Sequence, residues 1–126
     1  MMSAPLILSS DLTRVTQSPA MLAILGSDAV IAIDQDPLGE AATVVRSDAT
    51  LDVLVKRLAN GDRAIAIFNH GEAATAFQES IDTLGFGACP SCSYVIEDLW
   101  TSARPAVISG TLTAHAAALF RVRQAR

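Results

Sequence analysis

Residues 51–69 read LDVLVKRLANGDRAIAIFN, and this stretch predicts the fold. Apolar residues alternate in part along its first half, which places Val53 and Lys56 on opposite sides of an extended chain. The dipeptide Asn60-Gly61 follows, and because both residues tolerate a positive φ angle, it favours a tight hairpin turn. A second apolar run, 63–69, follows the turn and can lie antiparallel to the first. The stretch therefore predicts two antiparallel strands joined by a hairpin.

Further runs of strand length lie on both sides of this hairpin. Turn-forming residues separate them at intervals of about 8–12 residues, which is typical of an antiparallel β-sandwich. No helix of useful length is predicted after Gly39, so the chain is expected to be mainly β. The predicted strands are 43–46, 51–58, 63–69, 74–78, 94–100, 107–108 and 116–122.

The first third of the chain has a different pattern, with the signals of a short helix over 18–26. Ser18 can cap its start, Pro19 suits its first turn, and Gly26 can stop it in a left-handed conformation. The apolar run 5–8 has the length of a strand. Together these segments predict one β-then-α unit ahead of the sandwich.

A second apolar run, 29–33, is broken sharply by Asp34-Gln35-Asp36-Pro37-Leu38-Gly39. Proline moves the residue before it out of the helical region, and glycine permits a chain reversal. We therefore place a domain boundary near residue 40, with one domain over 1–40 and a second over 41–126.

Length and charge exclude several classes of protein. The chain has 126 residues, whereas a complete (β/α)₈ barrel usually needs about 250. A formal net charge of −4, with scattered arginines, argues against nucleic acid as a partner. No apolar run approaches the roughly 18 residues that span a bilayer, so no membrane association is predicted. The apolar start lacks the basic region of a secretory signal, which leaves the localisation unknown.

Few side chains are arranged for chemistry. Asp34 and Asp36 could in principle act as paired carboxylates, but on a turn such residues usually bond their own backbone. His70 is predicted in an exposed turn, and His115 at the start of the last strand, where it would bond the backbone. Neither histidine belongs to a nucleophile motif or to a set of metal ligands. We predict no catalytic residue, no metal site and no cofactor.

Cys89 and Cys92 form a C-x-x-C motif. A redox motif of this type opens a helix after a strand, whereas this one lies in a glycine-rich loop before a strand. As a zinc site it would need a second pair of ligands. The sequence favours a local disulfide that clamps the loop, provided that the protein is secreted.

Several of these stretches resemble one family, the α-galactosidases of glycoside hydrolase family 27, also called melibiases. The segment 2–12 resembles the entry into the last barrel strand, and 58–69 resembles the family hairpin. The most specific match is the signature turn that leaves the barrel. It comprises Asp34, Gln35, Asp36, Pro37, Leu38 and Gly39, where family members often have asparagine at the first position. Further similar stretches are 98–101 and 115–116.

The resemblance implies an architecture and a role. Members are retaining glycosidases that remove terminal α-linked galactose, and they pair a catalytic barrel with a C-terminal antiparallel β-sandwich. On this basis residues 1–40 are the last strand and helix of an incomplete barrel. The family's two catalytic aspartates correspond to no residue of this sequence, so the chain alone is expected to be inactive. Members are often secreted, and some carry a close cysteine pair in this loop.

The exposed barrel strand has physical consequences. Cut free from its neighbours, the apolar run 5–8 presents an unpaired edge, which promotes association. We expect residues 1–17 to pack on the sandwich, to self-associate or to be disordered. The partner is then either the missing barrel portion or a second copy. The alternative functions are a stand-alone glycan-binding module, which the scarcity of aromatic residues disfavours, and a pure interaction module.

Overall fold

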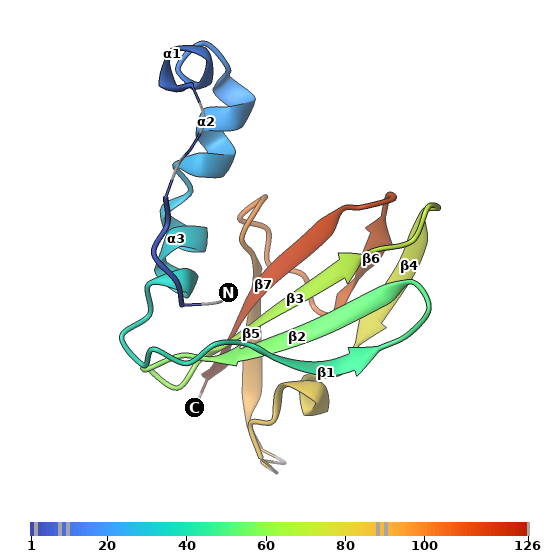
Figure 1. Cartoon of the computed structure of the whole chain (residues 1–126). Helices are drawn as coiled ribbons and strands as arrows, with labels where there is room; N and C mark the ends of the chain where they lie inside the picture. The colour runs from blue at the N-terminus through green and yellow to red at the C-terminus, as the bar shows by residue number, and fades with distance from the viewer. Residues whose placement is uncertain (2, 8, 10, 88, 90, 126) are drawn as a thin grey trace.

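The computed structural model describes residues 1, 3–7, 9, 11–87, 89 and 91–125. A helical unit precedes a set of strands and projects away from it (Figure 1). The three helices are α1 (Leu12–Val15), α2 (Pro19–Leu25) and α3 (Asp28–Asp34). The strands are β1 (Thr43–Ser47), β2 (Leu51–Arg57), β3 (Arg63–Asn69), β4 (Thr75–Glu79), β5 (Ser93–Asp98), β6 (Ile108–Leu112) and β7 (Ala117–Ala125), with a 3₁₀ helix, η1 (Ile81–Leu84), between β4 and β5.

Helix α2 begins and ends where the sequence predicts, but the glycine that ends it does not have the predicted conformation. The Ser18 hydroxyl accepts a hydrogen bond from the amide of Met21, as an N-cap does. Gly26, however, has φ −100° and is not left-handed. The next residue, Ser27, is already the N-cap of α3, so no reversal is needed at Gly26. The described helices include none long and apolar enough to cross a membrane.

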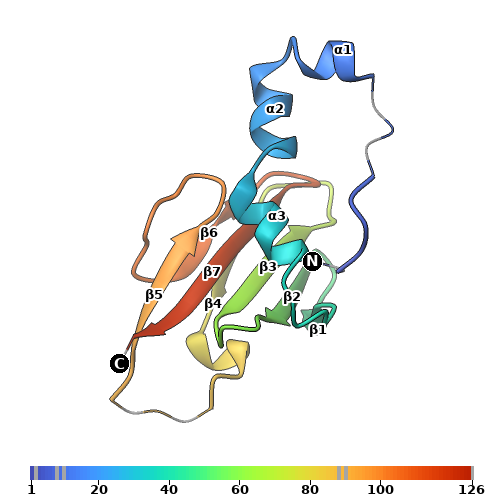
Figure 2. The same ribbon diagram turned by 90° about the vertical axis from the view of Figure 1, so that its left-hand side faces the viewer.

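The strand predicted over 5–8 is absent from the described residues. Pro5, Leu6 and Ile7 are irregular, and Leu8 lies outside the described residues. A strand needs neighbours that accept its backbone hydrogen bonds, and this segment runs beside the helices rather than beside a sheet (Figure 2). The prediction of a strand was therefore wrong for this chain on its own.

The strands form a sandwich of two antiparallel sheets. The larger has the order β1-β2-β3-β7-β5, and the smaller consists of β4 and β6. Strands β2 and β3 pair in full register from Leu51 with Asn69 to Arg57 with Arg63, which confirms the hairpin. Strand β1 pairs with β2 through a register shift between Val44 and Arg46.

The hairpin turn is longer than the sequence predicts. The amide of Leu58 donates to the carbonyl of Asp62, and the amide of Gly61 donates to the carbonyl of Leu58. Only Gly61 has a positive φ, 89°, while Asn60 does not. These bonds enclose a three-residue loop over 59–61, which needs one left-handed residue at its end, whereas the two-residue turn expected from Asn60-Gly61 needs two.

Strand β6 is longer than its apolar residues suggest. The prediction covered 107–108, but pairing with β4 continues to Leu112 through Gly110. A Cβ atom at Gly110 would lie 3.1 Å from the ring of Phe77 on the neighbouring strand. Glycine is therefore used here because the aromatic ring lies across the backbone, and a hydropathy pattern does not show this.

The large sheet is covered on both faces, and each face has its own core. Between the two sheets lies the main core, built around Ile65, Ile67, Phe77, Phe120 and Val122. On the opposite face α3 lies across the sheet (Figure 2), and a second core forms there. Its buried members are Ile33, Leu58, Ala64, Leu99 and Leu119. The helical unit is thus attached to the sandwich through α3.

Candidate functional site at the junction of the two units

The signature turn 34–39 connects α3 to β1, at the junction of the helical unit with the sandwich. Asp34 is the last residue of α3, and its side chain is only 10% exposed. Its carboxylate accepts a hydrogen bond from Gln35 Nε2 at 2.9 Å and lies 3.4 Å from the amino group of Met1. The first residue of the turn is therefore engaged inside the protein.

The next residues tie three segments together. Gln35 Nε2 also donates to the carbonyl of Ala4 at 3.1 Å. Asp36 Oδ1 accepts from the amide of Leu38 at 3.0 Å and from that of Ala59, beyond β2, at 2.9 Å. One carboxylate thus shapes its own turn and holds the β2–β3 connection. Gly39, at φ +69°, completes the reversal by donating its amide to the Asp36 carbonyl.

Electrostatics keep Asp34 charged. Burial alone raises the pKa of its carboxyl, but the hydrogen bond from Gln35 and the positive charges of Met1 and Lys56 outweigh burial. The pKa of Asp34 therefore lies below its ordinary value of 3.8. Such a group holds a charge steadily at neutral pH, whereas a general acid needs a raised pKa.

Acid is expected to loosen the junction through this residue. Because the folded pKa of Asp34 is lowered, its contribution to stability is complete above pH 3.8 and is lost as the pH falls through the folded pKa. Amide protection factors of α3, measured between pH 6 and pH 2.5, should fall in acid. The fall should be shallower in Asp34→Asn, and equal profiles for the two proteins would exclude this role.

The remaining candidate residues lie far from one another. The imidazole of His70 lies 3.9 Å from the Asp52 carboxylate, and His115, at φ 59°, lies 3.5 Å from Glu72. Both histidines are on the surface. In the described part of the chain, no three or more His, Cys, Asp or Glu side chains gather as a metal site would require.

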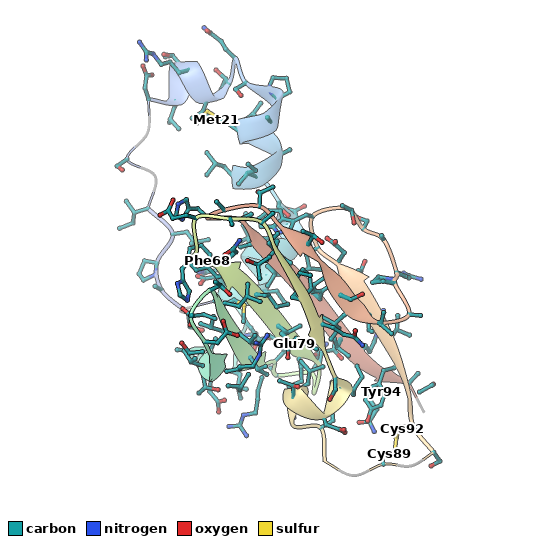
Figure 3. All side chains as sticks on the ribbon, turned by 90° about the vertical axis from the view of Figure 1, so that its right-hand side faces the viewer. Met21, Phe68, Glu79, Cys89, Cys92 and Tyr94 are labelled. Carbon is teal, nitrogen blue, oxygen red and sulfur yellow. A yellow bond between two sulfur atoms is a disulfide. The ribbon has the colours of Figure 1, made fainter. Side chains whose placement is uncertain are left out.

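Cys89 and Cys92 form a disulfide in a loop at the far end of the sandwich from the helical unit (Figure 3). The Cα atoms are 5.4 Å apart. Pro90, within the motif, lies outside the described residues. Gln124 of β7 donates to the sulfur of Cys92, which holds the bridge near the last strand. The disulfide is thus remote from the junction.

Sequence reasoning missed the most unusual residue of the junction, Lys56. It is fully buried beneath α3, and its ammonium group contacts the carbonyls of Ile33 and Asp34. The alternation along β2 places Lys56 on the face opposite Val53, but it does not reveal that this face is covered. The available signal was the position of the chain's only lysine within an apolar strand.

Comparisons with known proteins agree with this architecture. The family model described as the alpha galactosidase C-terminal beta sandwich domain matches residues 48–122. Alpha-galactosidase A of Aspergillus niger is 37% identical over 123 residues, which cover 95% of this chain and 22% of that protein. The chain thus spans about a fifth of the length of this curated relative.

Solved structures share the fold. Alpha-galactosidase I from Mortierella vinacea superposes with a TM-score of 0.82 at 22% identity, over 95% of this chain and 32% of that one. The α-galactosidase of Saccharomyces cerevisiae, solved with raffinose, gives 0.80 at 18% identity, over 98% and 41%. With more than half of its length matched by the family model, the chain belongs to the α-galactosidase C-terminal β-sandwich family and corresponds to the C-terminal portion of glycoside hydrolase family 27 enzymes.

Proposed function

We propose that this chain is the non-catalytic C-terminal part of a retaining α-galactosidase, an enzyme class that hydrolyses terminal α-D-galactosyl residues. In this proposal residues 1–40 supply the last strand and helix of the barrel, and residues 41–126 are the sandwich that supports them. The partner is the remaining barrel portion, and the chain contributes structure rather than a reacting group.

The observation that carries the proposal is the apolar surface of the helical unit. Helix α2 has no buried residue, although most of its side chains are apolar. A mostly apolar hollow of about 560 Å³ opens between the helices and the sheet. Met21 of α2 lies far out from the sandwich (Figure 3). Among the described residues of 1–40, the exposed large apolar side chains are Leu6, Ile7, Leu12, Met21, Leu22, Ile24 and Leu38.

Such a surface marks a docking face, because monomers rarely leave contiguous apolar patches in water. A barrel strand is paired on both edges and covered on both faces, which would account for an apolar run whose described residues, 5–7, lie outside any sheet here. Self-association through the same segment is the alternative way to cover it.

The carboxylates of the junction support a structural role. A retaining glycosidase needs two carboxyl groups about 5–5.5 Å apart that both face the sugar. Asp34 and Asp36 are instead occupied by Gln35 and by backbone amides. The hydrolytic residues therefore belong to the partner in this proposal.

Reconstitution tests the proposal. The Aspergillus niger relative would be produced without the segment that this chain matches, and assayed on a chromogenic α-galactoside alone and with this chain. Neither part should show turnover alone, and the mixture should. Turnover by the purified chain would contradict the proposal. Saturable binding of galactose or melibiose in calorimetry, without any gain of activity, would instead favour a glycan-binding module.

A matched variant identifies the docking face. Leu6→Ser with Ile7→Ser should abolish the activity gain, while Val107→Ser, an exposed apolar position on the sandwich, should not. Sedimentation of the chain alone at several concentrations distinguishes a barrel partner from a second copy of the chain, because only the second copy gives a dimer without the barrel. A dimer that the double variant dissolves would show that a second copy covers this face.

A further inference from the structure

The ammonium group of Lys56 is buried, yet all of its donors have partners. Its side chain is 0% exposed. Nζ donates to the carbonyl of Ile33 at 2.5 Å, to the carbonyl of Asp34 at 3.2 Å and to the hydroxyl of Ser3 at 2.7 Å. An ammonium group has three N–H donors, so the set of acceptors is complete.

These partners all belong to residues 1–40, while Lys56 belongs to the sandwich. The two carbonyls are at the last turn of α3, where helix carbonyls lack partners within the helix and the helix dipole attracts a cation. The Ser3 hydroxyl in turn donates to the carbonyl of Glu40. One side chain of β2 therefore holds the N-terminal segment, the end of α3 and the linker.

Further contacts join residues 1–40 to the sandwich. Met1, Val30 and Ile33 pack on the sheet, and Asp36 accepts from the amide of Ala59. At the linker, the carbonyl of Met1 accepts from the amide of Ala42, and the exposed Arg57 bonds the carboxylate of Glu40. Helix α3 has seven residues, too few to be stable in water without packing. The main core of the sandwich, on the other face of the sheet, contains no residue of the helical unit among its buried members. The sandwich can therefore persist when α3 leaves.

We propose that Lys56 is a latch: its charge holds the helical unit on the sandwich, and release of this one side chain lets the unit undock while the sandwich stays folded. In the docked state the ammonium satisfies three acceptors, and in the undocked state it returns to water. The inference goes beyond the proposed function, because it holds whether or not a barrel covers the helices.

The uniqueness of Lys56 provides the first test. An amine-acylating reagent can modify only the chain's amino terminus and this lysine, and mass spectrometry distinguishes the two. Ile33→Glu should undock α3 and raise the rate of Lys56 modification by about tenfold or more, while circular dichroism shows an intact sandwich. Modification of Lys56 only under conditions that unfold the sandwich would overturn the latch.

Hydrogen exchange of Lys56→Met provides the second test. The amides of Ile31 and Gln35 should exchange about tenfold faster or more, and those shared by β3 and β7 should not change. The control is Arg46→Met on β1, which also removes a positive charge but whose partners, Asp48 and Glu79, both belong to the sandwich. Equal acceleration in helix and strands, or none in α3, would contradict the proposal. The acylation test needs no substitution of Lys56, so it decides the matter if this variant does not fold.

Discussion

Asn69→Asp is expected to destabilise the sandwich by about 4 kcal/mol, because it sets a buried carboxylate against carbonyl oxygens. Asn69 ends β3 and is 0% exposed. Its amide nitrogen donates to the carbonyls of Ala73 at 2.8 Å, Leu112 at 3.1 Å and Thr113 at 2.9 Å. Its oxygen accepts from the amide of Gly71. The side chain thus joins the end of β3 to the end of β6, in the other sheet.

Urea unfolding followed by circular dichroism measures this effect. The control is Gln78→Glu, the same chemical change at an exposed position of β4, which should alter the free energy of unfolding by less than about 0.5 kcal/mol. Similar losses in the two variants would show that added negative charge, rather than the buried amide network, is responsible.

Phe120→Ala is expected to lower the free energy of unfolding by about 4 kcal/mol, the usual cost of removing a buried aromatic ring and leaving a cavity. Phe120 lies on β7, is 3% exposed and pairs with Ile65 of β3. Its ring centroid is 6.2 Å from that of Phe77 on β4, at an interplanar angle of 56°. The pair connects the two sheets through the centre of the main core.

Two controls make this measurement specific. Phe68→Ala removes the same ring from an exposed position of β3 (Figure 3), where 38% of the residue faces water, so the loss should be much smaller. Phe120→Leu keeps most of the buried volume and should cost less than about 1.5 kcal/mol. A loss from Phe68→Ala as large as that from Phe120→Ala would contradict the assignment of the core.

The local signals in the sequence predicted most of the sandwich because strand alternation and turn residues act over a few positions. The hairpin of β2 and β3 follows directly from its pattern. The irregular state of Pro5–Ile7 could not be predicted in this way, because a strand depends on neighbours as well as on its own residues. Gly26 illustrates the same limit, since the onset of α3 at Asp28 decides its conformation.

The junction shows a further limit of sequence reasoning. The break at 34–39 is visible as a proline and a glycine after an apolar run, but the contacts of its side chains reach residues far along the chain, such as Ala59. The burial of Lys56 depends in the same way on α3 covering the second face of the sheet. A pattern within one strand cannot show which element packs against it.

The buried lysine also fixes how β2 aligns with its neighbours. A slip of one residue in strand pairing moves every side chain of that strand to the opposite face. Such a slip would place an ammonium group within the apolar layer between the two sheets, near Ile65, without the carbonyls that now surround it. Lys56 therefore excludes the misaligned sheet more strongly than any apolar residue at this position could, and it selects a single arrangement of the strands during folding.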